Sequence, residues 1–302
     1  MLKKDNKQLK DIWIMLRDWI DAARPRTLPA SASPVIAATA YAWHYGVMNV
    51  VAAVICLLFA LLAQIASNFA NDYYDYKKGS DRADRVGPRR AVASGDISPK
   101  SMLMATLLTL IIACGLGLSL LIWGGWWLIL AGLAIVVFAV AYSAGPYPLS
   151  YKGLGDVAVF IFFGLVAVNL TYYVQALHFC IEVFWGSVAI GLLSVNILMV
   201  NNYRDVEADR LSGKKTVVVR FGYTFARYAY FFNGVVALLC TVDVWFSCGF
   251  WSVGAAVLFL GVHIITWRKM CILKGTALNP ILGKTALNLL IFTILLSIFL
   301  ML

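Results

Sequence analysis

Long stretches without any charged residue alternate with short charged segments along this chain. A transmembrane helix needs roughly 20 mostly apolar residues, so three of these stretches can hold two helices each and three can hold one. The stretches are 27–71, 101–151, 157–181, 183–203, 285–302 and 228–267, the last with Asp243 as its single charge. The pattern predicts nine transmembrane helices, near 28–45, 50–76, 101–121, 126–144, 155–177, 184–205, 224–245, 249–267 and 282–302.

The composition agrees with an all-α integral membrane protein. Of the 302 residues, 62% are hydrophobic and 13% are charged, whereas a soluble domain carries about 25% charged residues. The six cysteines are scattered without paired spacing, which indicates small apolar side chains and neither a metal site nor a disulfide framework.

The placement of the basic residues predicts the orientation. With nine helices, all 25 Lys and Arg residues fall on the side that holds the N-terminus. An excess of Lys and Arg marks the cytoplasmic face, so we expect the N-terminus inside and the C-terminus outside. The net charge of +10 then reflects topology and attraction to anionic lipid. Nucleic acid is not indicated, because no soluble domain remains to carry that charge.

The first 26 residues differ from the rest of the chain. They are rich in both basic and acidic residues, and Ile12, Trp13, Leu16, Trp19 and Ala23 fall on one helical face. This pattern is typical of an amphipathic helix lying on a membrane surface. We therefore expect a cytoplasmic amphipathic segment over 1–26, followed by a single transmembrane domain over 27–302.

Two clusters of acidic and amide side chains stand at the inner ends of the second and sixth predicted helices. At about 100° per residue, the members of each cluster share one helix face. Oxygen ligands of this kind suit Mg²⁺, and the absence of His and Cys argues against zinc. We define the first motif as Asn68, Asn71, Asp72 and Asp75, and the second motif as Asn201, Asp205 and Asp209.

Basic residues surround both motifs, as a bound diphosphate requires. They are Lys77, Lys78, Arg82, Arg85, Arg89 and Arg90 near the first motif, and Arg204, Arg210, Lys214 and Lys215 near the second. A single charged residue at a helix end is usually a solvated face. Two stripes that repeat Asn-x-x-x-Asp favour a metal–diphosphate site instead, because paired acidic groups at membrane depth indicate function. Asp81, Asp84 and Asp96 can either join that site or only balance the charge of the loop.

Five segments resemble the UbiA superfamily of membrane prenyltransferases, and within it the bacterial 1,4-dihydroxy-2-naphthoate polyprenyltransferases of menaquinone synthesis. The segments are Arg24 to Pro29, Asn71 to Asp81, Asp84 to Val92, Tyr151 to Asp156, and Asn201 to Thr216. The superfamily pattern Asn-x-x-x-Asp-x-x-x-Asp is complete in the second motif. After Asn71 and Asp75 its third position is Gly79, which leaves open whether Asp81 touches metal.

The resemblance implies nine helices around a central cavity, with the diphosphate at the cytoplasmic mouth between the second and sixth helices. It also implies a bacterial cytoplasmic membrane protein whose active site faces the cytoplasm. In the implied reaction, a polyprenyl chain from a polyprenyl diphosphate replaces the carboxylate of 1,4-dihydroxy-2-naphthoate, which releases CO₂ and diphosphate and gives demethylmenaquinone.

The residues of both motifs receive roles in this hypothesis. Asp72 and Asp75 hold one Mg²⁺, and Asp205 and Asp209 hold a second. The remaining candidates orient the carboxylates or contact phosphate oxygens: Asn71, Asn201, Arg89, Lys152, Arg204 and Lys214. Tyr142, Tyr147 and Tyr151 could stabilise an allylic cation through cation–π contacts, or could equally be interfacial aromatics.

Two alternatives remain at this point. Intramembrane charges and a possible internal repeat would also suit a transporter, although transporter sites tend to lie near the bilayer midplane. Among enzymes, the acceptor could be another aromatic acid such as 4-hydroxybenzoate. The expected partners are the two substrates and the lipid bilayer; no protein partner is implied.

Overall fold

The computed structural model describes residues 2–79, 86–143 and 148–302, and these residues form helices and loops with no strand. Six helices of this described part are long and apolar enough to cross a membrane: Val50–Lys77, Pro99–Gly124, Gly155–Ala176, Ile181–Leu211, Phe250–Ile272 and Gly275–Met301. A shorter apolar helix covers Leu128–Tyr142. The protein is therefore an all-helical protein with several candidate membrane spans.

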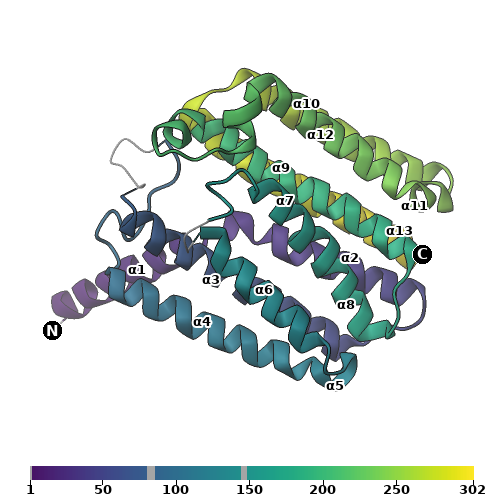
Figure 1. The fold of residues 1–302 in the computed structure, drawn as a ribbon, viewed down its shortest axis with the longest axis horizontal. Coiled ribbons are helices and arrows are strands. Elements are labelled where there is room, and N and C mark those ends of the chain that lie inside the picture. Colours follow the sequence, from purple (N-terminus) through teal and green to yellow (C-terminus); the bar gives the residue numbers. More distant parts are fainter. Residues whose placement is uncertain (1, 80–85, 144–147) are drawn as a thin grey trace.

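Most helices run along the long axis of an elongated bundle, and the loops gather at its two ends (Figure 1). In chain order the elements are α1 (Leu2–Ala23), η1 (Pro25–Thr27), α2 (Pro29–His44), α3 (Val50–Lys77), α4 (Pro99–Ser119), α5 (Leu121–Gly124), α6 (Leu128–Ser143), α7 (Gly155–Val159), η2 (Phe160–Val166), α8 (Ala167–Ala176), α9 (Ile181–Leu211), α10 (Val217–Cys240), α11 (Val242–Ser247), α12 (Phe250–Ile272), η3 (Gly275–Leu278) and α13 (Asn279–Met301). All nine stretches expected to span the membrane are thus helical over most of their length.

Two helix bounds differ from the expectation in a way that matters for the site. α9 continues to Leu211, so the whole second motif is helical, and the chain leaves the helix at Gly213 with a φ of 74°. Glycine adopts this left-handed conformation without steric cost, which makes it the usual residue just past a helix end. α10 begins at Val217, where the Thr216 side chain accepts a hydrogen bond from the Val219 amide at 3.4 Å and caps the helix. Gly222, with a φ of 80°, then interrupts α10, so its continuous part begins beside the expected start at 224.

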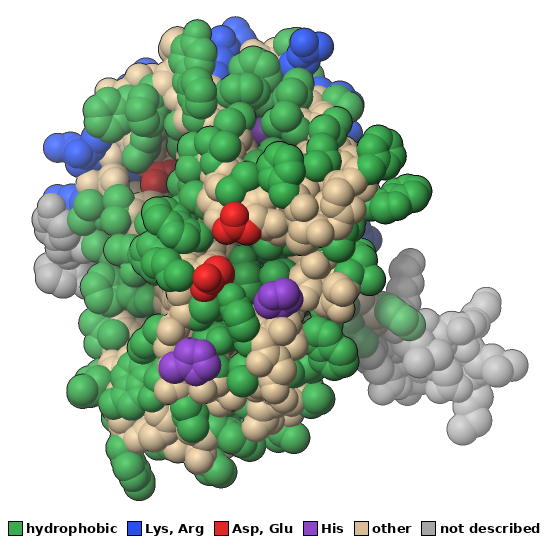
Figure 2. Space-filling view, turned by 90° about the vertical axis from the view of Figure 1, so that its right-hand side faces the viewer, with side chains coloured by type: hydrophobic (Ala, Val, Ile, Leu, Met, Phe, Trp, Pro, Cys, Tyr) green, Lys and Arg blue, Asp and Glu red, His purple; other side chains and the backbone are tan. Residues whose placement is uncertain are grey.

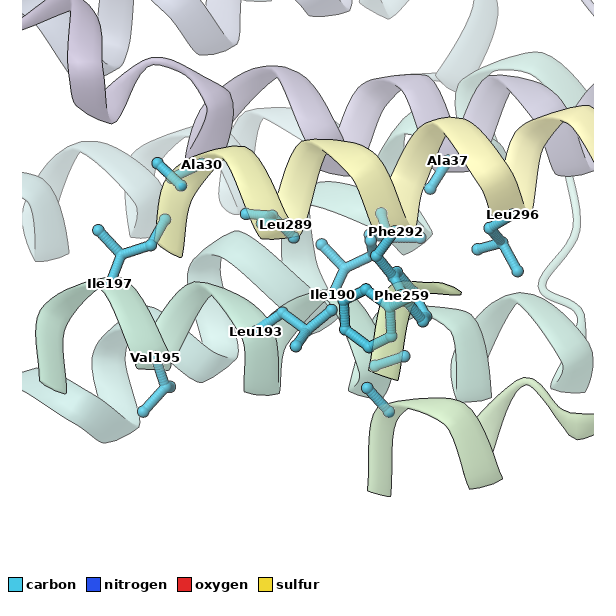
Figure 3. Close-up of a cluster of buried hydrophobic side chains, with 14 of the residues drawn as sticks. Ala30, Ala37, Ile190, Leu193, Val195, Ile197, Phe259, Leu289, Phe292 and Leu296 are labelled. Carbon is cyan, nitrogen blue, oxygen red and sulfur yellow. The ribbon is translucent and has the colours of Figure 1, made fainter. Parts of the chain in front are cut away.

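The largest apolar core lies where α2, α9, α12 and α13 meet (Figure 3). Phe259 of α12 and Phe292 of α13 are fully buried, with their ring centroids 4.9 Å apart in an edge-on arrangement. Such a pair contributes about 0.5–1.5 kcal/mol beyond the burial of its area. Ala30 and Ala37 show why α2 packs so closely against α13: small side chains let the backbones of membrane helices approach.

A π-helical segment, η2, joins α7 to α8 and packs against α9. A Cβ atom at Gly164 of η2 would lie 2.6 Å from the Cα of Gly191 in α9, so these backbones touch where only glycine fits. π-helical turns inside α-helices are frequently found at functional sites. Here the close contact between η2 and α9 also holds the preceding helix α7 against α9.

The two ends of the bundle differ in charge. The loops that follow α3 and α9 lie at the end that also holds α1 (Figure 1). Figure 2 looks onto the opposite end, which is largely hydrophobic with a few acidic and histidine side chains, while basic side chains show only at its margin. Both motifs therefore lie at the basic end.

Candidate active site

One cavity of about 1480 Å³ opens between the helices at the basic end and continues into the apolar interior. Both motifs contribute to its wall: Asn68, Asn71, Asp72 and Asp75 from α3, and Asn201, Asp205 and Asp209 from α9. Its deeper part is lined by apolar residues of α3, α4, α6 and η2, among them Phe59, Gly117, Leu133, Val136 and Phe162. The cavity thus joins a polar mouth to an apolar chamber.

The first motif is held by the loop that follows it. Asp72 is 2% exposed, and its Oδ2 accepts a hydrogen bond from the backbone amide of Ala91 at 3.2 Å. Asp75 forms an ion pair with Arg90, with 3.6 Å between Oδ2 and Nη2. Asn68 lines the same cavity, and its Nδ2 donates to the carbonyl of Ala23 at 2.9 Å. The acidic end of α3 is therefore covered by residues 90 and 91 and tied to the end of α1.

The second motif is held mainly within its own helix. The guanidinium of Arg204 donates to both carboxylate oxygens of Asp205, at 2.7 and 2.6 Å, and to Oδ1 of Asn201 at 2.8 Å. Its side chain is 1% exposed, and its Nη1 also donates to Oδ1 of Asn279 at 2.9 Å. Charge-assisted hydrogen bonds with this forked geometry are strong, so Arg204 fixes the orientation of Asp205.

Two further residues connect the motifs across the mouth. Asn279, at the start of α13, accepts from Arg204 and donates through Nδ2 to the carbonyl of Val86 at 3.3 Å, which links α9 to the loop after α3. The ring of Tyr151 lies 4.6 Å from Nζ of Lys78 and 4.8 Å from Nζ of Lys214, so one aromatic ring contacts a lysine from each motif's loop. Sequence reasoning named Tyr151 and Lys214 but gave Asn279 no role.

These contacts shape the electrostatics of the mouth. Burial lowers the pKa of Lys78, the carboxylate of Asp75 opposes this effect, and the charge of Lys214 lowers the pKa further. A bound anion would stabilise the protonated amine and raise that pKa again. Lys214 lines the cavity and Lys78 lies beside the same Tyr151 ring, so this pair of cations favours an anion such as a diphosphate next to them.

The candidate phosphate contacts occupy different places. Arg89 is 68% exposed at its side chain, and pairs with Asp96 at 2.5 Å; Arg90, one residue on, is the arginine that reaches Asp75. Arg89, Arg204 and Lys214 line the cavity, whereas Lys152 is not among the lining residues of the described structure, and its carbonyl accepts from Arg220 at 2.7 Å. Asp81, Asp84 and Tyr147 lie outside the described residues.

Two cavity residues, Arg24 and Asp156, belong to the family-like segments but received no role from the sequence. Arg24 lines the mouth with a left-handed φ of 54°, which is uncommon for a residue other than glycine and marks local strain. Asp156, at the start of α7, is buried in the cavity wall. The strain of Arg24 and the environment of Asp156 depend on tertiary contacts, so no pattern in the sequence could have indicated them.

The donor set of the two motifs fits a hard divalent cation. It consists of carboxylate and amide oxygens, and within the described residues no three His, Cys, Asp or Glu side chains form a ready-made metal cluster. Mg²⁺ does not need such a cluster, since it binds through one or two carboxylates, several waters and substrate phosphate oxygens. The residues present therefore suit a magnesium–diphosphate complex better than a metal held by protein alone.

The chain belongs to the UbiA prenyltransferase family, whose pattern matches residues 31–279. A relative from Escherichia coli K12, a 1,4-dihydroxy-2-naphthoate octaprenyltransferase, is 36% identical over 280 residues, which cover 88% of this chain and 89% of the relative. A Mycobacterium tuberculosis relative with the same name is 40% identical over 221 residues, covering 73% of this chain and 74% of the relative.

Solved structures share the fold. A UbiA homologue from Archaeoglobus fulgidus, bound to DMAPP and Mg²⁺, superimposes with a TM-score of 0.64 at 15% identity and covers 93% of this chain and 99% of its own. The same homologue bound to GPP and Mg²⁺ gives a TM-score of 0.63 at 16% identity with the same coverage. At these identities the likeness defines the fold alone.

Proposed function

We propose that this protein transfers a polyprenyl chain from a polyprenyl diphosphate to 1,4-dihydroxy-2-naphthoate, with release of CO₂ and diphosphate. The observation that carries the proposal is a single cavity with Asp75 and Asp205 at its polar mouth and an apolar chamber behind them. The mouth suits the diphosphate and its metal, and the chamber suits the prenyl chain. The names of the bacterial relatives support the naphthoate acceptor and a prenyl chain of octaprenyl type.

In this proposal each motif holds one magnesium ion. Asp72 and Asp75 are the ligands in the first motif, and Asp205 and Asp209 are those in the second. When bound, the ions would neutralise charge that grows on the diphosphate as the allylic C–O bond breaks. The metal-bound homologue structures support this role for magnesium.

The surrounding residues orient the substrate and take up the remaining charge. Asn71 and Asn201 direct the carboxylates, while Arg204 and Lys214 donate to phosphate oxygens. Arg90 is placed to do the same from the first motif's loop, nearer to Asp75 than the more exposed Arg89. Because these cations are held before the substrate arrives, they stabilise the transition state without reorganising during the reaction.

The electron balance of the reaction fixes its immediate product. A π electron pair of the ring forms the new C–C bond to the allylic carbon. The electron pair of the bond between the ring and the carboxylate then returns to the ring, which restores aromaticity as CO₂ leaves. No electrons are lost, so the ring stays at the hydroquinone level. A separate oxidation must then yield the quinone itself.

We also propose nine membrane crossings with the N-terminus in the cytoplasm. α2, α6 and α10 would complete the six long spans, residues 27–302 would form one transmembrane domain, and residues 1–26 would lie on the membrane surface. The exposed Trp13, Leu16 and Ile20 of α1 suit burial in the lipid interface. The protein would lie in a bacterial inner membrane, with its active site facing the cytoplasm.

A C-terminal alkaline phosphatase fusion should then be active outside the cytoplasm, and an inactive fusion would reject this orientation.

The function is tested with purified protein in detergent. Labelled polyprenyl diphosphate is offered with Mg²⁺ and with 1,4-dihydroxy-2-naphthoate or 4-hydroxybenzoate in separate reactions. We expect a prenylated naphthalene product, equimolar CO₂ and diphosphate, and no product after chelation of the metal. Preference for 4-hydroxybenzoate would reassign the acceptor, and the absence of any prenylated product would reject the proposal.

A further inference from the structure

Asp156 is a buried acidic residue that the roles above leave unused. It is 9% exposed and lines the cavity from the first turn of α7. Among the described residues, no group forms a hydrogen bond with its Oδ1. A buried carboxylate oxygen without a partner lowers stability, because it has given up its bonds to water. Such an arrangement is readily explained when a ligand supplies the missing donor.

The position of Asp156 separates it from the diphosphate end. A Cβ atom at the neighbouring Gly155 would lie 3.4 Å from the side chain of Leu198 in α9. Leu198 precedes Asp205 by seven residues, which corresponds to roughly 10 Å along a helix axis. Asp156 therefore stands deeper in the bundle than the second motif, on the same cavity wall.

The surroundings of Asp156 suit an aromatic ring. The hydroxyl of Tyr142 would lie 3.4 Å from the same Cβ position at Gly155. Val159 and Phe162, one and two turns further along α7 and η2, also line the cavity. A carboxylate beside apolar and aromatic groups repels a diphosphate but accepts a hydrogen bond from a hydroxyl on a ring.

We propose that Asp156 binds the aromatic acceptor by accepting a hydrogen bond from one of its ring hydroxyl groups. The inference rests on the proposed prenyl transfer and identifies the acceptor subsite within it. A hydrogen bond to a carboxylate draws the hydroxyl proton away from its oxygen, which enriches the ring in electrons. The bond would thus orient the acceptor on the inner side of the metal ligands and also favour attack by the ring carbon on the allylic carbon.

The test measures acceptor binding and turnover separately. Wild type, Asp156→Asn, Asp156→Ala and the control Glu207→Gln are purified in detergent. Glu207 is a matched acidic control, because it also borders the cavity but pairs with Arg210 in an exposed position. Binding of 1,4-dihydroxy-2-naphthoate is measured with Mg²⁺ and a non-reactive prenyl thiodiphosphate, and steady-state rates are measured with the reactive diphosphate.

We expect Asp156→Ala to weaken naphthoate binding and to lower kcat/KM for the naphthoate by about 10- to 100-fold, the effect of one hydrogen bond to a charged group. The KM for the prenyl diphosphate and all constants of Glu207→Gln should stay unchanged. Wild type should also discriminate against 1-hydroxy- or 4-hydroxy-2-naphthoate, whichever lacks the bonded hydroxyl. Asp156→Ala should lose that discrimination, because the variant has no carboxylate left unpaired when the substrate lacks the hydroxyl.

Stability distinguishes this role from a structural one. Both Asp156 variants should unfold in detergent at the wild-type temperature or above it, since they remove a buried charge. Variants that bind and prenylate like wild type would overturn the assignment of Asp156 alone. Variants that unfold earlier and lose both substrates together would also overturn it, by showing a structural role. A wild type that neither binds nor prenylates any naphthoate would overturn this inference together with the proposed function.

Discussion

The two motifs carry similar chemistry on helices that are held in different ways. α9 runs through the interior of the bundle, and Arg204 fixes Asp205 and Asn201 within the helix itself. α3 has one side facing outward over most of its length, and its carboxylates are held by residues 90 and 91 of the following loop.

One motif is thus held by hydrogen bonds within a buried helix, and the other by the backbone and a side chain of a loop. Hydrogen bonds within a buried helix persist while the helix is folded, whereas a loop can open locally at lower free energy. Asn279 joins the two, since it accepts a hydrogen bond from Arg204 and donates one to the carbonyl of Val86 in that loop.

The largest expected effect comes from removing one carboxylate of either motif. We expect Asp72→Ala and Asp205→Ala each to lower turnover by about a hundredfold or more, as for the loss of a single electrostatic group in an active site. Prenyl transfer by purified protein at saturating substrate measures this effect, with Glu207→Gln as the control. Near-normal turnover in either variant would remove that residue from the proposed metal site.

The stability of arginine variants tests the comparison directly. Arg204→Met should lower the free energy of unfolding by about 1.5–3 kcal/mol, because it removes charge-assisted hydrogen bonds to Asp205, Asn201 and Asn279. Arg90→Met should cost about 1 kcal/mol, since its contact with Asp75 is longer and lies in a loop. Unfolding by SDS in mixed micelles measures both changes. Equal losses would show that the two motifs are equally rigid.

A smaller effect is expected at the link between the motifs. Asn279→Ala should cost about 1–2 kcal/mol, because it removes hydrogen bonds to Arg204 and to the carbonyl of Val86. Asn279→Asp keeps the acceptor for Arg204 but cannot donate to Val86. Amide hydrogen exchange should therefore rise in residues 86–96 for both variants, and in residues 201–209 for the Ala variant alone. Unchanged exchange in residues 86–96 would show that Asn279 does not restrain the loop.

Local composition and spacing were enough to predict the apolar helices and the shared helix face of each motif. Uncharged stretches of membrane-spanning length defined the apolar helices, because a chain in lipid must satisfy its backbone hydrogen bonds internally. The spacing of Asn201, Asp205 and Asp209 placed them on one face, since α-helical geometry is fixed locally. The family was also evident in the sequence, through motifs that span most of the chain.

The contacts that these side chains make follow from the tertiary structure. Arg89, expected to contact the phosphate, lines the cavity and pairs with Asp96, and the fold also turns Arg90 toward Asp75. Sequence reasoning gave no role to Asn279 or Asp156, because their positions depend on how α13 and α7 pack against helices distant in sequence. The physical reason is that helix formation follows local composition, whereas the direction of a loop side chain and the burial of a charge follow contacts between remote segments.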